Sequence, residues 1–291
     1  MNKYIDSINY LISKKTNQVP HNNNNLFNHL VNVYNKLRKW NCHEDICYAG
    51  LFHSIYGNDS FTFKTETDRE VIKKLIGKDA ELLVYLYNQE RYQNKKLRII
   101  SLANELDQNF IHLIDNYFDK EDTTKTYFYF RDKVPWKFLG SGTDGTKWRK
   151  FKYDLTFNNE IENKFKKSTE NILKNLKFFD LLQLERVYAS GNPYGTVHES
   201  HRDYDIDSDG GITIMYYLNN NWDLSLGGET VFYDTNNYDI QKSIIPKPGR
   251  VVVFDGLIEH CARDTVRSFN DLRMVLTFKY KINIKEKKIN E

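Results

Sequence analysis

The first 108 residues carry apolar side chains at the three- and four-residue intervals of amphipathic helices. The predicted apolar helical stretches span residues 28–40, 44–56, 68–76, 82–87 and 97–106. Asp68 is a suitable N-cap for the third of these helices, and Gly77 is a suitable residue to end it. Gly and Pro are sparse throughout this half, and the polar tract 22–25 predicts a loop. The pattern is typical of a compact helical unit.

The pattern changes near Phe110, where turn residues begin to separate short apolar runs. Residues 111–118 predict a strand and turn, 133–149 a glycine-containing loop, and 159–178 one amphipathic helix. The strands predicted after that helix span residues 181–188, 211–218, 229–233, 249–254 and 273–280. Short strands at this spacing favour a β-sandwich or a jelly roll.

Composition narrows the class of protein. The chain is 40% hydrophobic and 28% charged, as in globular proteins, which excludes a collagen, a coiled coil or a wholly disordered chain. A net charge of +3 gives no general attraction to nucleic acid or anionic membrane, so neither partner is expected. The basic stretch 279–288 predicts a solvated tail.

Sequence features also predict a cytoplasmic location. No apolar run approaches the length of a membrane span, and the first residues lack the apolar core of a signal peptide. Cys42, Cys47 and Cys261 form no CxxC pair and are odd in number, so reduced, buried thiols are expected.

The most informative polar residues are His201 and Asp203, in an HxD pair, and the distant His260. Residues two apart on a strand point to the same side, so His201 and Asp203 can bind one ion together. Imidazole suits iron, copper, nickel and zinc, and the carboxylate adds a hard anionic oxygen. Two imidazoles and one carboxylate on one face of an octahedral ion leave three positions open for a chelating cosubstrate and oxygen. An HxD pair alone is weak evidence, and surface or core histidines are the alternative.

The residues around the HxD pair form an ordered series of motifs. After the HxD pair come a YLN strand end at 217–219, GGET at 227–230, PKPG at 246–249 before an apolar strand, His260 and the basic Arg273. This series resembles the iron(II)- and 2-oxoglutarate-dependent dioxygenases, specifically the prolyl 4-hydroxylase-like branch. The resemblance covers roughly residues 110–283 and implies a double-stranded β-helix (jelly-roll) core with supporting helices.

The resemblance implies a role for each matching residue. His201, Asp203 and His260 would hold Fe(II), and Arg273 would pair with the far carboxylate of 2-oxoglutarate, a task that suits a guanidinium fork. Tyr188 would donate its hydroxyl to that cosubstrate, although a plain core tyrosine is nearly as good a reading. The alternatives to Arg273 are Arg263 and Arg267, which lie in a predicted loop.

The implied activity is hydroxylation of an unactivated C–H bond with Fe(II), 2-oxoglutarate and O2, releasing succinate and CO2, with ascorbate as an optional reductant. Related halogenases lack the carboxylate ligand, so the presence of Asp203 favours hydroxylation. A peptidyl prolyl residue is the leading substrate, by family analogy alone. The alternative is a free small molecule.

Residues of the helical half resemble a divergent HD-like domain. The match consists of His29, His53 and Asp107, with Ser54 at the position where an Asp is expected. Loss of that carboxylate argues against two-metal hydrolysis, but the three residues could still bind one metal or a phosphate. A helical recognition module is the favoured reading.

The predicted fold is therefore α+β, with an all-helical HD-like domain over residues 1–108 and a dioxygenase jelly roll over 109–291. Two other functions stay open at this point. One is an HD-like phosphohydrolase or nucleotide-binding protein with an accessory jelly roll, which Ser54 disfavours. The other is a jelly-roll binding module without activity, which the intact HxD…H set and Arg273 disfavour.

Overall fold

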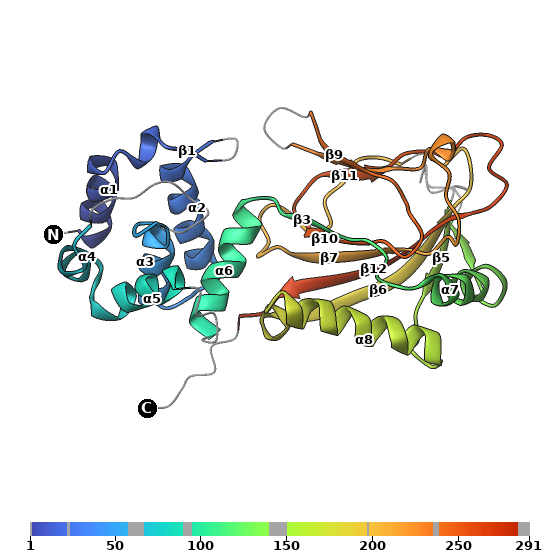
Figure 1. Ribbon diagram of the computed structural model, residues 1–291, viewed down its shortest axis with the longest axis horizontal. Helices are drawn as coiled ribbons and strands as arrows, with labels where there is room; N and C mark the ends of the chain where they lie inside the picture. The colour runs from blue at the N-terminus through green and yellow to red at the C-terminus, as the bar shows by residue number, and fades with distance from the viewer. Residues whose placement is uncertain are drawn as a thin grey trace. The chain divides into compact units, whose positions relative to one another are not determined.

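The computed structural model describes residues 2–21, 24–57, 67–89, 95–139, 150–196, 198–234 and 239–284. The chain forms two compact units, Met1–Phe110 and Ile111–Asn283 (Figure 1). The first unit is built of helices and the second around antiparallel sheets.

The helical unit packs its helices around a short apolar one. Its helices are α1 (Lys3–Ser13), α2 (Leu26–Lys39), α3 (Glu44–Phe52), α4 (Arg69–Ile76), α5 (Lys78–Asn88) and α6 (Lys95–Asp107), with a 3₁₀ turn η1 (Thr16–Gln18) and a strand pair β1 (Pro20–His21) and β2 (Asn24–Asn25). In α3 every residue from Ile46 to Phe52 is buried. Gly50 allows α3 to approach α2 closely, because a Cβ at this position would lie 2.3 Å from Leu37 Cδ1.

The predicted helices of this unit are present, and their ends have the expected chemistry. The Asp68 side chain accepts a hydrogen bond from the Glu70 N–H, which confirms it as the N-cap of α4, and Gly77 ends that helix with φ +95°. Two local features were not predicted. Helix α1 was not predicted because its apolar residues do not mark its buried side: Ile5 and Ile12 are exposed, whereas Ser7 is buried. Part of the expected loop at 22–25 instead pairs as β2, and residues 22 and 23 lie outside the described residues.

Two antiparallel sheets form the second unit in the described part of the chain. The seven-stranded sheet has the order β3 (Ile111–Ile114), β10 (Val251–Asp255), β7 (Gly211–Tyr217), β12 (Arg273–Ile282), β6 (Leu182–Asn192), β5 (Lys150–Asp154) and β4 (Lys137–Leu139). The three-stranded sheet has the order β11 (His260–Ala262), β8 (Thr230–Tyr233) and β9 (Ile240–Ile244). The other elements are α7 (Lys120–Asp132), α8 (Glu160–Asn175), η2 (Phe179–Leu181) and η3 (Leu224–Leu226).

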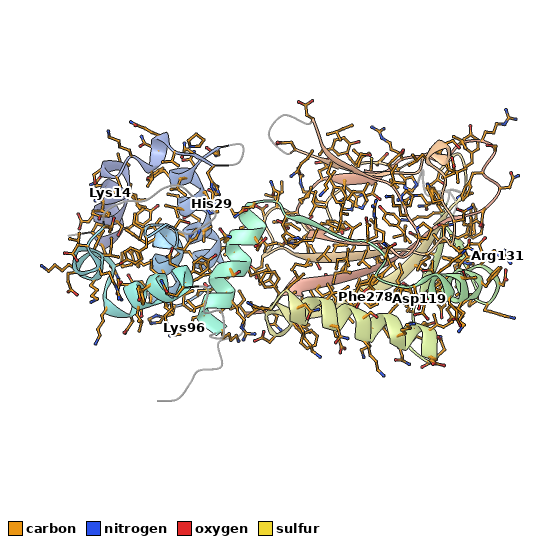
Figure 2. The ribbon with its side chains drawn as sticks, in the orientation of Figure 1. Lys14, His29, Lys96, Asp119, Arg131 and Phe278 are labelled. Carbon is orange, nitrogen blue, oxygen red and sulfur yellow. The ribbon has the colours of Figure 1, made fainter. Side chains whose placement is uncertain are left out.

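Alternation along the strands gives the larger sheet two different faces. Helix α8 runs along one face, beside β12 and β6 (Figure 1), and its Thr169 Oγ1 lies 2.8 Å from the Tyr216 hydroxyl of β7. Phe278 of β12, labelled in Figure 2, is fully buried on this face, with its ring 5.9 Å from that of Tyr216. The opposite face shares a hydrophobic core with the smaller sheet, to which β7 contributes Met215 and β8 contributes Phe232. Thr213 of β7 and Thr277 of β12 lie on this second face, because each is two residues from a member of this core, Met215 and Val275.

The structure confirms a mixed helix-and-sheet fold with a large antiparallel sheet, and differs from the prediction in detail. Strand β4 lies within the expected loop 133–149, of which residues 140–149 are outside the described residues. Helix α7 was not predicted, because its buried side includes Thr123 and Thr126, and threonine has low helix propensity. Among the described residues, the helices are too short or too polar to cross a bilayer.

Candidate metal centre and its cavity

The predicted metal ligands meet where the loop after β6 pairs with β11. His201 and His260 form an isolated antiparallel bridge, in which each N–H donates to the other residue's carbonyl oxygen, at 3.0 Å and 2.9 Å. The Asp203 N–H donates to the Gly256 carbonyl oxygen at 2.8 Å. This backbone pairing, rather than side-chain packing, brings the HxD pair to the distant histidine.

The three side chains converge through defined atoms. Asp203 Oδ1 lies 3.8 Å from His201 Nε2, and Asp203 Oδ2 lies 3.9 Å from His260 Nε2. The Nδ1 atoms face backbone carbonyl oxygens, that of Glu199 at 3.3 Å and that of Ile258 at 2.9 Å. An Nδ1–H that donates to a carbonyl leaves the Nε2 lone pair of a neutral imidazole available for a metal.

Among the described residues, this is the one group of three or more His, Cys, Asp or Glu side chains whose donor atoms can share an ion. All the candidate ligand atoms lie within 4.8 Å of one another. The structure thus brings together the three residues that the sequence predicted as ligands.

Asp203 is a buried carboxylate whose two oxygens are each held by a neighbour. Lys279 Nζ lies 2.5 Å from Oδ1, and the Thr213 hydroxyl donates to Oδ2 at 2.5 Å. Burial disfavours ionisation, but the electrostatic interactions with His260 and Lys279 and these hydrogen bonds outweigh it and hold the pKa of Asp203 below its usual range. Asp203 is therefore an oriented carboxylate anion at neutral pH.

His260 lies among aromatic rings, whereas His201 is the open side of the group. The His260 ring is 5.6 Å from that of Phe232 and 4.9 Å from that of Phe254, and burial lowers the pKa of His260. The His201 side chain is 46% exposed, so any ion held here is approached from the His201 side.

Arg273 lies in the same cavity as the three candidate ligands, at the start of β12. Its side chain is buried, Nε donates to the Gly228 carbonyl oxygen at 2.6 Å, and one terminal nitrogen donates to Thr230 Oγ1 at 2.8 Å. Gly228 has φ +76°, and a Cβ there would lie 2.8 Å from a Trp222 ring carbon. The GGET turn therefore needs glycine at this position in order to hold the arginine in place.

Of the other residues considered from the sequence, Tyr188 and His198 line the cavity, whereas the alternative arginines do not. Tyr188 lines the cavity from β6, directly opposite Thr277 of β12, and burial raises the pKa of its phenol. Arg263 and Arg267, the alternatives to Arg273, are exposed. His198 lines the cavity outside the donor group, and burial with the Arg273 and Lys150 charges lowers its pKa to about 3.

Sequence reasoning missed three polar residues near Asp203 and Arg273. Its prediction of a solvated tail from residue 279 onward is wrong for residues 279–282, which belong to β12. Lys279 and Thr213 hold Asp203, and Lys150 lines the cavity with a pKa lowered by burial and by neighbouring cations. The signal for Lys279 was available, because side chains two apart share a strand face and Arg273 and Lys279 are six apart on β12. Lys150 follows residues that carry no strand pattern, so nothing in the sequence placed it here.

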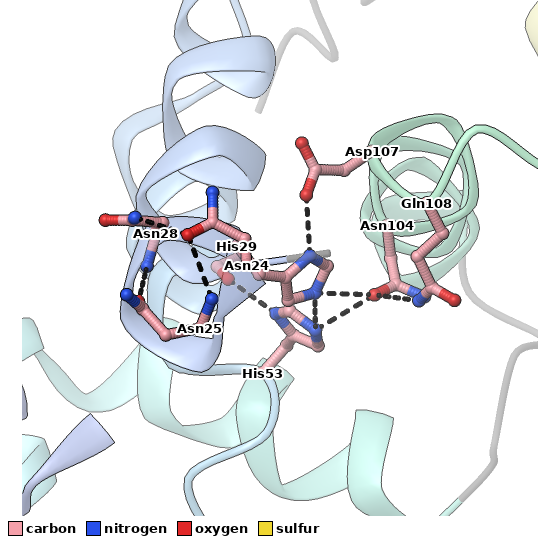
Figure 3. A network of polar contacts seen from close by, with 9 residues as sticks. Asn24, Asn25, Asn28, His29, His53, Asn104, Asp107 and Gln108 are labelled. Atoms are coloured by element: carbon pink, nitrogen blue, oxygen red, sulfur yellow. Dashed lines mark hydrogen bonds and ion pairs between the residues drawn. The ribbon is translucent and has the colours of Figure 1, made fainter. Parts of the chain in front are cut away.

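The helical unit brings its predicted residues together in a different way (Figure 3). His29 Nδ1 lies 2.6 Å from Asp107 Oδ2, and His29 Nε2 lies 3.3 Å from His53 Nε2. Asn104, which the sequence did not single out, places its Oδ1 at 3.0 Å and 3.1 Å from these two Nε2 atoms. Its position three residues before Asp107 on α6 puts both side chains on one helix face.

Two family models each match a part of the chain. Residues 186–280 match the 2OG-Fe(II) oxygenase superfamily, and residues 10–90 match a domain of unknown function, DUF6817. The first match spans every residue predicted for the iron and cosubstrate sites. The HD-like assignment of the helical unit stays a prediction. No curated protein shows significant sequence similarity to this chain.

Several solved structures are similar to the chain at low identity. A prolyl-4-hydroxylase from Pseudomonas putida is 14% identical, covers 62% of this chain and 97% of its own, and has a TM-score of 0.49. The viral collagen prolyl hydroxylase of Paramecium bursaria Chlorella virus-1 with 2-oxoglutarate is 17% identical, with coverages of 61% and 99% and a TM-score of 0.45. HygX from Streptomyces hygroscopicus, with nickel and 2-oxoglutarate bound, is 12% identical, with coverages of 62% and 85% and a TM-score of 0.45.

Proposed function

We propose that this chain, whose residues 186–280 belong to the 2OG-Fe(II) oxygenase superfamily, hydroxylates an unactivated C–H bond of a peptidyl prolyl residue. The chain is a dioxygenase that uses Fe(II), 2-oxoglutarate and O2. The observation that carries the proposal is the convergence of His201, Asp203 and His260 on a cavity that also contains Arg273. The two sheets, which share one core, are proposed to form the double-stranded β-helix of that superfamily.

The three candidate ligands suit an iron(II) ion in the types of their donor atoms and in the orientation of their imidazole rings. Two neutral imidazoles and one carboxylate are the donor set expected of non-haem Fe(II) sites with open positions. Both Nδ1 atoms face carbonyl oxygens, so His201 and His260 would bind the ion through their Nε2 atoms. When bound, Fe(II) with 2-oxoglutarate and O2 supplies the oxidation that inserts the hydroxyl group and releases succinate and CO2.

Arg273 is proposed to bind the far carboxylate of 2-oxoglutarate. It enters the cavity already held by Gly228 and Thr230, so little side-chain freedom remains to be lost on binding. Burial strengthens its attraction for an anion, and a guanidinium can bind a carboxylate through two parallel hydrogen bonds. Tyr188, on the neighbouring β6, is proposed as a hydroxyl donor to the same cosubstrate.

The residues around Asp203 are proposed to orient it for the metal. The Thr213 hydroxyl and the Lys279 ammonium each hold one carboxylate oxygen, and each of those oxygens faces one histidine. Partners of this kind fix the direction of a ligand and keep it ionised. The cations Lys150 and Arg273 give the cavity wall a positive charge that suits a dianionic cosubstrate.

For the helical unit we keep the proposal of an HD-like recognition module. His29, His53 and Asp107 support it, since helices α2 and α6 and the C-terminal end of α3 bring them together. Ser54 offers no carboxylate beside His53, which disfavours hydrolysis with two metal ions.

The test of the substrate is a coupled turnover assay with two panels of compounds. The protein, with Fe(II) and 2-oxoglutarate, is incubated with proline-containing peptides or with free small molecules, and succinate and product masses are measured. We expect peptides to gain one oxygen atom on proline, with one succinate formed for each hydroxyproline. Coupled turnover confined to free small molecules would overturn the prolyl assignment, while the dioxygenase assignment would stand.

A further inference from the structure

A row of cationic side chains borders the cavity on the outer strands of the larger sheet. Residues that pair directly across antiparallel strands point to the same side of the sheet. Tyr188 of β6 lines the cavity and pairs with Asp154 of β5, so residues two and four positions before Asp154 share the cavity face. These residues are Lys152 and Lys150, and Lys150 itself lines the cavity.

Two more cations lie on the same face. Lys137 of β4 pairs with Lys152, and Arg186 of β6 pairs with Lys279 of β12, whose ammonium reaches the cavity. Both Lys137 and Arg186 are exposed, whereas the two β5 lysines are partly buried. The row therefore continues from the cavity wall to the protein surface, and its members form what we call the basic strip: Lys137, Lys150, Lys152 and Arg186.

The cations lie close together, with three of them around the ring of Tyr188. The distances to the ring centre are 5.7 Å from Lys152 Nζ, 4.8 Å from Arg186 Cζ and 5.8 Å from Lys279 Nζ. Burial lowers the pKa of Lys150, and the charges that lower it further are those of the same three cations. Because like charges this close repel one another, the face favours the binding of an anion.

Carboxylates neutralise part of this positive charge. Lys152 Nζ lies 2.5 Å from Asp154 Oδ1, and Lys279 Nζ lies 2.5 Å from Asp203 Oδ1. Arg186 forms no ion pair within the described part of the chain. Fe(II) and the 2-oxoglutarate dianion carry equal and opposite charges, so their binding together leaves the positive surplus of the strip unchanged. The surplus is therefore available to a third ligand, the substrate.

The basic strip runs beside the metal end of the cavity. Arg186 pairs with Lys279, which holds the carboxylate of Asp203. Neighbouring strands are about 4.8 Å apart, so β5 lies about 10 Å from β12. An extended peptide advances about 3.4 Å per residue, so about three residues separate a carbon at the metal centre from a group bound on the strip.

We propose that the substrate carries an anionic group, a carboxylate or a phosphate, which Lys150 and Arg186 bind while the carbon to be hydroxylated lies at the metal centre. The inference rests on the proposed function, and for a peptide it places an acidic or phosphorylated side chain within about three residues of the target proline. An ammonium and a guanidinium bind either anion through charge-assisted hydrogen bonds. Lys150 and Arg186 thus select the substrate, whereas Arg273 binds the cosubstrate.

The test compares ligands that differ in a single charge. Full-length protein with Fe(II) and saturating 2-oxoglutarate is kept anaerobic, and the Kd of labelled proline peptides is measured by fluorescence anisotropy. Each peptide carries aspartate, phosphoserine, asparagine or lysine within three residues of the proline. Small carboxylates and phosphates, paired with their uncharged amides and alcohols, compete with the label. We expect the anionic member to bind about 10- to 100-fold more tightly, the value of a charge-assisted hydrogen bond, and the lysine peptide to bind most weakly.

The possible outcomes separate this inference from the proposed function. If neither the peptides nor the small compounds show a preference for the anionic member, the inference is overturned, and hydroxyproline formation on admission of O2 still decides the prolyl assignment. A preference for anions among small compounds alone, with hydroxylation confined to them, would support the strip and overturn the prolyl assignment.

Matched variants show which cations carry the preference. Lys150→Met and Arg186→Met should each raise the Kd of the aspartate peptide about 10-fold and leave that of the asparagine peptide unchanged. Lys167→Met removes the same charge from an exposed position of α8, on the other face of the sheet, and should change neither Kd. Arg186→Glu should favour the lysine peptide, a gain that misfolding cannot produce.

The competing arrangement is one in which Lys150 assists Arg273 in binding the cosubstrate. Lys150→Met would then raise the Kd of 2-oxoglutarate and leave the ratio of the aspartate and asparagine peptide affinities unchanged. That result, together with an unchanged ratio in Arg186→Met, would overturn the proposal.

Discussion

Two pairs of histidines, His201 with His260 and His29 with His53, differ in the charge of the side chains beside them. At the oxygenase site an ionised carboxylate, Asp203, faces both imidazoles, and cations line the cavity around it. In the helical unit a neutral amide, Asn104, occupies the corresponding place, and the carboxylate of Asp107 bonds the other side of His29. The first arrangement suits a metal ion that also binds a dianionic cosubstrate, whereas the second places its carboxylate outside the meeting point of the two imidazoles.

The clusters also differ in how the backbone builds them. A bridge between a loop residue and the first residue of β11 brings His201 to His260, and the site lines a cavity with one histidine half exposed. The helical cluster depends on side-chain packing between α2, the end of α3 and α6, and both of its histidines are buried.

The largest effect is expected from removing an oxygenase ligand. His201→Ala or Asp203→Ala should reduce 2-oxoglutarate turnover about 1,000-fold or more, equivalent to about 4 kcal/mol of transition-state free energy. Circular dichroism should show that the His201→Ala protein is folded, because the His201 side chain is half exposed and its loss removes nothing from the core. His112→Ala, at an exposed histidine of the same unit, is the control. Full turnover in both ligand variants would show that the metal assignment is wrong.

The next largest effect is expected at Arg273, one of the cationic side chains that line the cavity. Arg273→Lys keeps the charge but loses the guanidinium fork, so the KM for 2-oxoglutarate should rise about 10- to 100-fold, the value of one or two charge-assisted hydrogen bonds. Steady-state kinetics with varied 2-oxoglutarate measures this. Arg263→Ala and Arg267→Ala, at the exposed alternatives, should leave the KM unchanged. A larger effect at either of them would move the cosubstrate away from Arg273.

A smaller effect is expected at the residue that orients Asp203. Thr213→Val removes the hydroxyl bonded to Oδ2 while keeping the shape of the side chain, and should weaken Fe(II) binding about 10-fold. Thr277→Val, on β12 in the same cavity, is the control. Anaerobic iron titration gives both affinities. Equal weakening in the two variants would mean that cavity polarity matters and the orientation of Asp203 does not.

The smallest effect is expected from replacing the buried Glu162, whose surroundings differ from those of the buried Glu81 in the helical unit. Glu81 is paired with Arg69, whereas Glu162 of α8 is held by the Tyr129 and Tyr153 hydroxyls and by backbone N–H groups. Burial opposes ionisation of Glu162, but these donors outweigh it and lower its pKa. Its ionised form therefore stabilises the fold above the unfolded-state pKa, and this contribution is lost as the pH falls through the folded-state pKa.

Glu162→Gln should consequently flatten the loss of stability between about pH 5 and pH 3 relative to the unmutated protein. Urea unfolding at several pH values measures the slope. Glu160→Gln, at an exposed carboxylate two residues earlier, should keep the original slope. An unchanged slope in Glu162→Gln would show that its carboxylate titrates alike in the folded and unfolded states.

The sequence predicted which three residues meet at the candidate metal centre, because they stand in a linear series of motifs. The HxD pair, the GGET turn and Arg273 carry their own spacing, and the structure gathers them around one cavity. Lys279 was within reach of the same reasoning, through the two-residue period of β12. The assembly of His201 with His260 could not be derived, since it depends on a single backbone bridge between segments far apart in the chain.

The helical unit shows the limit of pattern reasoning more clearly. Apolar periodicity located α2 and α4, but α1 escaped it because exposed isoleucines and a buried serine break its pattern. His29, His53 and Asp107 came from a family resemblance, whereas Asn104 needed the packing of α6 against the other helices. An asparagine among the many of this chain carries no signal of its own until its neighbours in space are known.

The central claim is that His201, Asp203, His260 and Arg273 together bind iron and 2-oxoglutarate. Anaerobic titration of the metal-free protein with Fe(II) and then 2-oxoglutarate, followed by the weak visible charge-transfer band, tests it most directly. The band should form in the unmutated protein, be absent in Asp203→Ala, and require a higher 2-oxoglutarate concentration in Arg273→Lys. Iron bound without any band on addition of 2-oxoglutarate would contradict the account.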